Sequence, residues 1–106
     1  MSMKIVRNNI IPFKGYAAMN LFGILFVRKG VKITDRLINH ELIHTAQMKE
    51  MSYVPFYLWY VLEWLVRLTM KGNAYRNISF EREAYANEYN QDYLRHRKPY
   101  SWADYI

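Results

Sequence analysis

The chain has 106 residues, enough for one domain with a single core but too few for a catalytic domain plus a separate substrate-binding domain. Hydrophobic residues make up 52% of the sequence, so the chain is too apolar to be disordered. It contains no cysteine, which excludes disulfides and thiolate metal sites and leaves His, Glu and Asp as the strong metal ligands. We therefore expect one domain, residues 1–106, with any active site in an open groove.

The charge balance is basic, with 15 Lys and Arg against 9 Asp and Glu and a net charge of +6. Such an excess favours anionic neighbours, either nucleic acid or an acidic membrane surface. The basic cluster LRHRK, residues 94–98, precedes Pro99 and is typical of a helix C-terminus, where cations complement the helix dipole. No nucleic-acid-binding motif accompanies it, so we predict no specific nucleic-acid partner. The N-terminus lacks an apolar stretch of signal-peptide length, which predicts a cytoplasmic protein.

The first thirty-odd residues have the composition of short strands and turns. Two stretches are rich in strand-forming residues, KIV at 4–6 and LFGILFV at 21–27. Four residues that favour turns interrupt this region: Pro12, Gly15, Gly23 and Gly30. We expect two or three strands that form a small N-terminal sheet.

Three helices are expected after the sheet, over residues 35–51, 54–71 and 80–97. Thr34 or Asp35 suits the cap of the first helix, and Pro55 suits the first turn of the second. Gly72 and Asn73 would end the second helix, and Ser79 would cap the third. The predicted fold class is therefore α+β, a short N-terminal sheet followed by three helices.

The sequence HELIH, residues 40–44, falls in the middle of the first expected helix. At 3.6 residues per turn, His40 and His44 lie ~40° apart around the helix axis and ~6 Å apart along it, so both imidazoles can reach one ion. Glu41 lies one residue off that face, where it can take a proton from a metal-activated water. The alternative is a solvent-facing polar stripe, and the spacing favours the metal.

A catalytic zinc site needs a third protein ligand, with a fourth position open to water. Glu50 is excluded, because in a continuing helix it lies ~240° round from His44 and ~9 Å beyond it. The third helix, SFEREAYANE, is the better source of a carboxylate. Glu81 and Glu88 are seven residues apart and share one face, whereas Glu83 lies ~200° from Glu81 and points elsewhere.

HELIH followed about forty residues later by EREA, residues 81–84, resembles the gluzincin clan of zinc metallopeptidases, in particular its minimal and CAAX-type members. The resemblance covers roughly residues 20–95 and implies a zincin-like minimal domain. It implies three ligands for Zn²⁺: His40, His44 and Glu81. It also implies that Glu41 is the general base and acid, and that the substrate is a peptide or protein. In related peptidases the strand before the metal helix pairs with an extended substrate, and here LFGILFV is the candidate.

The chain departs from the family pattern at Tyr85, where the family has an Asp that orients a ligand histidine through its outer nitrogen. Glu88 or a backbone carbonyl is the candidate replacement. Tyr85 could instead donate a hydrogen bond to a developing oxyanion or pack in the core. Gln47 shares the ligand face, where it either lines the groove or is a solvated helix residue.

Residues 53–70 are apolar almost all the way round the helix, interrupted by Glu63 and Arg67. Two charges in the middle of the segment argue against a membrane span. Three alternatives remain: a buried core helix, a homodimer face, or a peripheral helix that places Trp59 and Trp64 at a membrane surface. We favour the core helix, because a small three-helix domain needs one central element.

The tail PYSWADYI, residues 99–106, has two interpretations. Its aromatic side chains could patch the core. Alternatively, the tail could fold back over the groove with Asp104 near the metal and keep the enzyme latent.

The function predicted from the sequence is that of a zinc-dependent metallopeptidase, in which Glu41 activates water at Zn²⁺ for hydrolysis of a peptide bond. The alternative is a non-catalytic zinc-binding protein, or an interaction module at a membrane surface or on another protein. The small size of the chain and Tyr85 favour this alternative.

Overall fold

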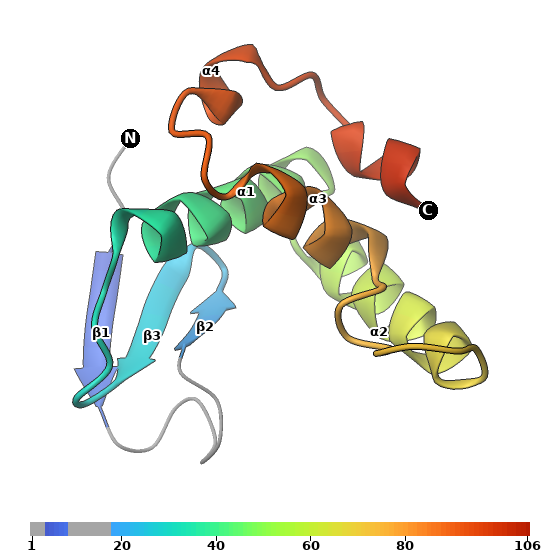
Figure 1. Cartoon of the computed structure of the whole chain (residues 1–106), viewed down its shortest axis with the longest axis horizontal. Helices are drawn as coiled ribbons and strands as arrows, with labels where there is room; N and C mark the ends of the chain where they lie inside the picture. Colours follow the sequence, from blue (N-terminus) through green and yellow to red (C-terminus); the bar gives the residue numbers. More distant parts are fainter. Residues whose placement is uncertain (1–3, 9–17) are drawn as a thin grey trace.

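A computed structural model of the chain describes residues 4–8 and 18–106 and shows an α+β fold (Figure 1). The N-terminal sheet has the strands β1 (Lys4–Asn8), β2 (Ala18–Leu21) and β3 (Ile24–Arg28). The helices that follow are α1 (Asp35–Glu50), α2 (Val54–Leu68), α3 (Ser79–Asn87), α4 (Tyr93–His96) and the 3-10 helix η1 (Ser101–Tyr105). The predicted fold class is therefore confirmed. Pro12 and Gly15, expected as strand punctuation, lie outside the described residues.

The sheet has the strand order β1-β3-β2, with β3 parallel to β1 and antiparallel to β2. The expectation of two or three strands is confirmed, but LFGILFV is not one continuous strand, because Phe22 and Gly23 turn the chain between β2 and β3. Both have positive φ, 53° and 88°, the backbone of a two-residue hairpin turn that matches the twist of the strands. As a result β3 is the central strand, and β2 is the edge that lies nearest α2 in Figure 1.

The buried side chain of Asn20 fixes the β2–β3 hairpin onto α1. Its Oδ1 accepts a hydrogen bond from the backbone N–H of Gly23 at 3.0 Å, which closes the turn. Its Nδ2 donates to the carbonyl of Glu41 at 2.9 Å and to Oγ1 of Thr45 at 3.0 Å. Strand β2 therefore lies beside the part of α1 that carries HELIH.

Helix α1 begins and ends where its sequence predicts. The side-chain oxygen of Thr34 accepts a hydrogen bond from the backbone N–H of Leu37 at 3.1 Å, so the N-cap prediction is confirmed. Pro55 lies in the first turn of α2, also as predicted, although α2 ends at Leu68 rather than at residue 71.

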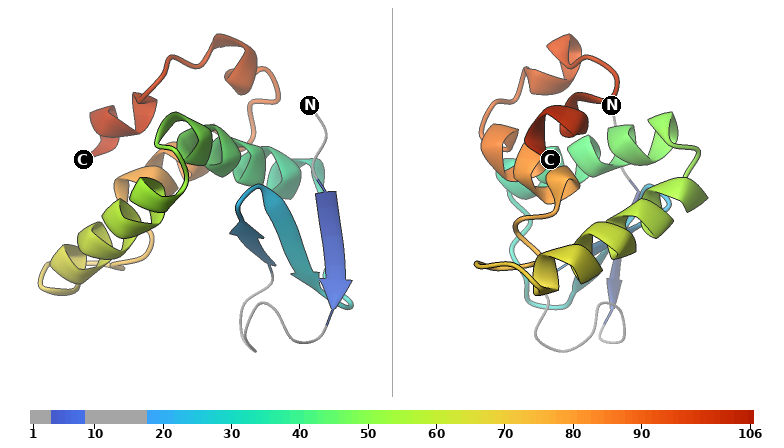
Figure 2. Two further views of the ribbon diagram at one scale, coloured as in Figure 1. Left: turned by 180° about the vertical axis from the view of Figure 1, so that it is seen from behind. Right: turned by 90° about the vertical axis from the view of Figure 1, so that its right-hand side faces the viewer.

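The prediction that residues 54–71 form a buried core helix is wrong. Phe56 is the only buried side chain of α2. Many apolar side chains of this helix are each more than half exposed: Val54, Leu58, Val61, Leu62, Leu65, Val66 and Leu68. Figures 1 and 2 show why, since α2 extends away from the sheet and α1 and is accompanied mainly by the segment that returns to α3. No helix within residues 18–106 is both long and apolar enough to cross a membrane.

The C-terminal tail occupies the core position that α2 leaves open. Trp102 of η1 is 7% exposed, and its ring lies 4.8 Å from that of Phe80 and 5.9 Å from that of Trp59. The prediction that tail aromatics patch the core is therefore confirmed. The alternative of a tail folded over the groove is wrong, because Asp104 is exposed and η1 packs against α3.

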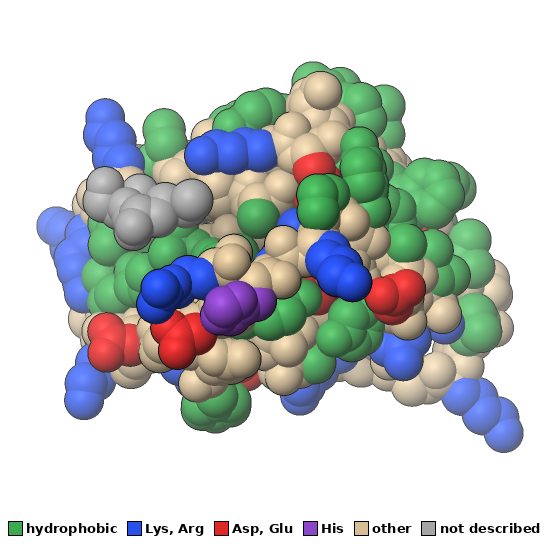
Figure 3. Space-filling model, turned by 90° about the horizontal axis from the view of Figure 1, so that it is seen from above, with side chains coloured by type: hydrophobic (Ala, Val, Ile, Leu, Met, Phe, Trp, Pro, Cys, Tyr) green, Lys and Arg blue, Asp and Glu red, His purple; other side chains and the backbone are tan. Residues whose placement is uncertain are grey.

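Lys and Arg side chains are spread over the face drawn in Figure 3 rather than gathered in one stripe. Within the basic cluster at 94–98, the arginine side chains differ in how exposed they are. The side chain of Arg95 is 77% exposed, whereas that of Arg97 is 5% exposed. The cluster therefore does not end a long helix as predicted.

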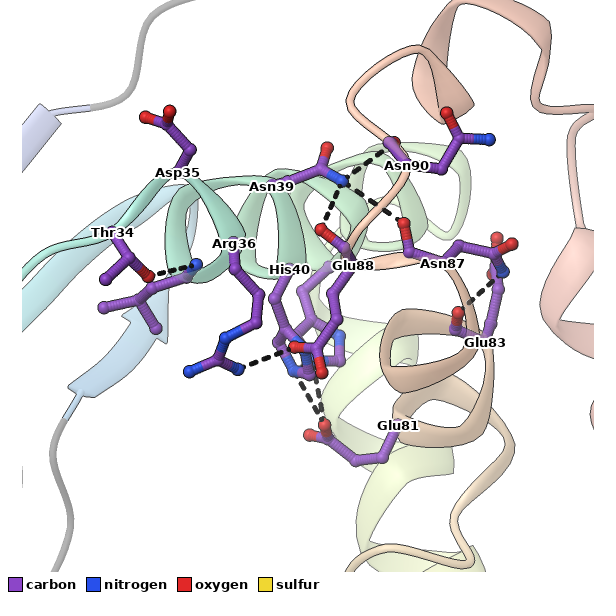
Figure 4. Close-up of polar contacts among 12 residues, drawn as sticks. Thr34, Asp35, Arg36, Asn39, His40, Glu81, Glu83, Asn87, Glu88 and Asn90 are labelled. Carbon is purple, nitrogen blue, oxygen red and sulfur yellow. Dashed lines mark hydrogen bonds and ion pairs between the residues drawn. The ribbon is translucent and has the colours of Figure 1, made fainter.

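The predicted helix over 80–97 is interrupted, because α3 ends at Asn87 and the chain turns before α4. The cause is Asn39 of α1, whose Nδ2 lies within 2.9 to 3.3 Å of the carbonyl oxygens of Asn87, Glu88 and Asn90 (Figure 4). The last carbonyls of a helix have no partner inside it, and here a buried side chain of another helix supplies one. Ser79 is the first residue of α3 rather than its cap, and its N–H and hydroxyl donate to Glu63.

Arg97 links three segments of the chain, because its guanidinium binds the carboxylates of Glu50 in α1 and Glu83 in α3. Its guanidinium contacts the Glu50 oxygens at 2.8 and 3.0 Å, and it also donates to both oxygens of the fully buried Glu83. Burial alone would raise the pKa of Glu83, but hydrogen bonds from Arg97 and Tyr93 outweigh it and hold that pKa below its usual range. This network ties α1 and α3 to the segment that leads into η1.

Arg97→Met should destabilise the fold by about 3–5 kcal/mol, because it leaves two carboxylates buried without their cation. The free energy of unfolding in urea measures this loss. Arg95→Met is the matched control and should change stability by less than about 0.5 kcal/mol, since Arg95 is exposed. Equal losses in the two variants would contradict the role given to Arg97.

Candidate metal centre

Two helices bring three buried ligand groups together at one point. Helix α1 carries His40 and His44, each 5% exposed, and α3 carries Glu81, which is 3% exposed. Nε2 of His40 lies 3.2 Å from Oε1 of Glu81, Nε2 of His44 lies 3.0 Å from the same oxygen, and the two Nε2 atoms are 3.2 Å apart. This group could hold a metal ion.

His40 is oriented by Glu88, the residue that follows α3. Nδ1 of His40 lies 3.0 Å from Oε2 of Glu88, and an ionised carboxylate only accepts, so Nδ1 carries the proton. Nε2 of His40 then faces Glu81, as Figure 4 shows. Glu88 is held in turn by Arg36 at 3.0 Å. Glu88 is thus not beside the two Nε2 atoms but on the other side of the His40 ring.

His44 is oriented by Gln47, which is fully buried and therefore not the solvated residue that one interpretation expected. Nε2 of Gln47 donates to the carbonyl of Phe80 and to Oε1 of Glu83, both at 3.0 Å, which fixes which way the amide faces. Its Oε1 therefore accepts from Nδ1 of His44 at 2.8 Å. Nε2 of His44 is left directed at Glu81.

The electrostatics of the cluster favour a positive charge between its ligands. Burial disfavours a charged imidazole, yet the adjacent Glu81 carboxylate outweighs it and raises the pKa of His44 to about 9. Burial would likewise raise the pKa of Glu81, but the charge and hydrogen bonds of the two histidines lower it instead. A proton or a metal cation satisfies the same requirement at this point.

A cavity of about 340 Å³ opens beside two of the three ligand residues, His44 and Glu81. Glu41, His44 and Glu81 all border it, strand β2 forms one wall, and Phe56, Tyr57 and Tyr60 of α2 form another. Across residues 4–8 and 18–106, no side chain or backbone group donates a hydrogen bond to the Glu41 carboxylate, and burial raises the pKa of Glu41. Neither Gln47 nor any residue of η1 lines this cavity.

Two tyrosines at the cavity carry polar groups that the sequence did not single out. The hydroxyl of Tyr60 donates to Oε2 of Glu81 at 2.7 Å. Tyr75 borders the cavity, and its side chain interacts with that of Tyr85. Burial, followed by the charge of Glu81, raises the pKa of both Tyr60 and Tyr75, so both hydroxyls keep their protons. Among ten tyrosines in the sequence, only the fold distinguishes these two.

Tyr85, which replaces the Asp of the gluzincin pattern, packs against the face of the site. Its ring centroid lies 4.7 Å from that of His40 in an edge-on arrangement, and the Arg76 guanidinium lies 4.1 Å from the Tyr85 centroid. Tyr85 does not border the cavity. Its contact with His40 is therefore a ring contact, and Glu88 provides the hydrogen bond to the outer nitrogen.

Gln47→Leu should weaken the affinity for a divalent metal such as Zn²⁺ or Co²⁺ about 10- to 100-fold, because His44 loses the acceptor that fixes its tautomer and ring orientation. Competition with a chelating dye measures the affinity. Gln91→Leu, at an exposed glutamine, is the control and should leave the affinity unchanged. An unchanged affinity in Gln47→Leu would show that this amide does not orient a ligand.

Comparison with protein-family models, with curated proteins and with solved structures gave no match. The resemblance to gluzincins thus rests on the short HELIH and EREA segments alone. The fold adds an independent observation. Glu81 lies 37 positions from His44 and 41 positions from His40 along the chain, yet its Oε1 lies within hydrogen-bond distance of both Nε2 atoms.

Proposed function

We propose that this chain is a zinc-dependent peptidase. One observation carries the proposal: the ligand atoms of His40, His44 and Glu81 converge at one point, and His44 and Glu81 border a cavity that Glu41 also borders. A structural metal site is closed by its ligands, whereas a catalytic site has three protein ligands and space for water and substrate.

The donor set suits Zn²⁺ in type and spacing. Zn²⁺ binds His nitrogen and carboxylate oxygen at ~2.0–2.2 Å in tetrahedral geometry, which places neighbouring donors ~3.3–3.5 Å apart. The donor separations of 3.0 to 3.2 Å in the cluster are within a few tenths of an ångström of that spacing. Both histidines donate from Nδ1 to oxygen acceptors, so Nε2 is the nitrogen that each would offer to Zn²⁺, which would displace the second proton of His44.

When bound, Zn²⁺ supplies a Lewis acid for the substrate carbonyl and makes water a nucleophile at neutral pH. Glu41 then acts as the proton carrier: its carboxylate takes a proton from the attacking water and gives it to the leaving amine nitrogen as the C–N bond breaks. The unpartnered Glu41 carboxylate is free to do this. Tyr75, at the cavity with its proton retained, is placed to donate to the developing oxyanion.

The substrate in this proposal is an extended peptide lying along β2. This strand is the edge of the sheet next to the cavity, and an edge strand offers backbone N–H and C=O groups to an added strand. Strand β3, part of the segment first expected in this role, is paired on both sides and has no free edge.

Purified protein should bind about one Zn²⁺ per chain, and His40→Ala, His44→Ala and Glu81→Ala should each weaken binding by at least about a thousandfold, because three ligands leave no redundancy. Metal analysis after dialysis and dye competition measure this. Glu63→Ala removes a carboxylate outside the cluster and should retain the metal. Full occupancy in Glu81→Ala would move the third ligand elsewhere.

Glu41→Gln should retain the metal and abolish peptide hydrolysis, since the amide keeps the shape of the side chain but cannot accept the proton. Cleavage of a diverse peptide library, read by mass spectrometry, measures the activity, with chelator-treated wild type as the negative control. A wild-type protein that holds zinc but cleaves no library member would instead favour the non-catalytic metal-binding alternative.

A further inference from the structure

Helix α2 presents a wide apolar face that nothing in the described chain covers. At ~100° per residue, the positions from Trp64 through Leu65 to Trp59 span an arc of ~220° around the helix. Eleven residues lie on this arc, and nine of them carry large apolar side chains: Trp64, Leu68, Val61, Val54, Leu65, Leu58, Leu62, Val66 and Trp59. The other two are Pro55 and the half-buried Tyr57. These nine side chains are exposed, from 38% for Trp59 to 68% for Leu58.

The charged residues of α2 lie on the opposite side, toward the protein. The Glu63 carboxylate accepts hydrogen bonds from the N–H and hydroxyl of Ser79 and from Nε1 of Trp59, the last at 2.9 Å. Arg67, one turn along, lies on the same side of the helix and is partly buried. A helix that faces water turns its charges outward. The reversed arrangement in α2 therefore indicates an apolar neighbour.

The width of the arc favours a membrane surface over a second copy of this helix. A packed helix partner covers a stripe of roughly 100°, so a dimer through α2 would leave about half of the apolar arc in water. An interfacial helix buries about half of its circumference in the boundary between headgroups and acyl chains. Trp59 and Trp64 stand at the two margins of the arc, the level at which tryptophan concentrates in membrane interfaces.

Charge complementarity indicates an anionic surface. Arg67, Lys71 and Arg76 lie at or beyond the C-terminal end of α2, and the only acid of the helix, Glu63, is bound to Ser79. The whole chain carries a net charge of +6. Basic residues flanking an apolar helix face add attraction to anionic lipid headgroups. The apolar surface also extends to Phe22 at the hairpin tip, which is 58% exposed and whose ring lies 5.1 Å from that of Tyr57.

We propose that α2 binds the surface of an anionic membrane, lying in the plane of the interface with its apolar arc among the acyl chains and Trp59 and Trp64 at headgroup level. The 15 residues of α2 are ~22 Å long, shorter than the ~30 Å hydrocarbon core, so the helix lies on the bilayer and does not cross it. This proposal does not depend on the metal site or on peptidase activity.

Co-sedimentation of the purified full chain with lipid vesicles tests the proposal. The protein should pellet with vesicles of phosphatidylcholine and phosphatidylglycerol, and more weakly with phosphatidylcholine alone or at high salt. Lipids brominated on their acyl chains should quench the fluorescence of wild-type Trp59 and Trp64, while the buried Trp102 stays unquenched. The absence of both pelleting and quenching would overturn the proposal, and so would a dimer through α2 that does not bind vesicles.

A pair of double variants with the same change in charge locates the contact. Val61→Glu with Leu65→Glu, in the middle of the arc, should weaken vesicle binding by at least about tenfold. Tyr89→Glu with Ile106→Glu, at exposed apolar positions outside α2, should bind with no more than about a threefold loss. Circular dichroism checks that both variants are folded. Equal binding by the two variants would show that the apolar arc is not the membrane contact. If the arc variant unfolds, quenching in the wild-type protein decides.

Discussion

The structure depends on a polar interface between α1 and α3. Helices usually pack through apolar side chains, but here the facing positions include His40, His44, Gln47, Glu81 and Glu83, all buried. A buried charge or polar group without a partner costs several kcal/mol, so these side chains must satisfy one another before the helices can pack. They do so through one connected set of hydrogen bonds, which also fixes the angle and register at which α3 meets α1.

Glu83 links the stability of the fold to the geometry of the candidate metal site. One of its oxygens accepts from Gln47, which sets the tautomer of His44, and both oxygens accept from Arg97. The same carboxylate therefore anchors the segment that leads to η1 and supports a ligand on the neighbouring helix. Because the partners of a ligand set are held by the fold itself, the Nε2 atoms are in place without rearrangement, which is the requirement for a preorganised site.

The sequence was informative wherever the decisive interaction is local. The spacing of His40 and His44 on one helix follows from 3.6 residues per turn, and Thr34 caps that helix through a residue three positions away. Helix periodicity separated Glu81 and Glu88 from Glu83, again a local property, and the resemblance of EREA to the gluzincin pattern implied Glu81. The fold class followed from these periodicities and from the strand-forming composition of the N-terminal segment.

The features that could not be predicted depend on contacts between distant residues. Helix α3 ends at Asn87 because Asn39, 48 residues earlier, binds its last carbonyls. The hairpin turn places the bulky Phe22 at positive φ, where the Tyr57 hydroxyl accepts from its backbone N–H at 2.9 Å. For α2 the sequence pattern is the same whether protein or lipid surrounds the helix, so only the packing of η1 into the core distinguishes the two.

Helix α2 has an inner side that borders the cavity and an outer side that is exposed and apolar. Tyr60 connects the inner side to the candidate metal site. On the inner side Phe56, Tyr57 and Tyr60 form a wall of the cavity, and the Tyr60 hydroxyl holds the outer oxygen of Glu81. Glu81 thereby receives support from a helix whose other side is exposed and apolar. Phe56 is the one buried side chain of α2, so this helix is held to the rest of the fold mainly by its inner side. A partner on the outer side would therefore act on the same helix that positions the Glu81 carboxylate through Tyr60.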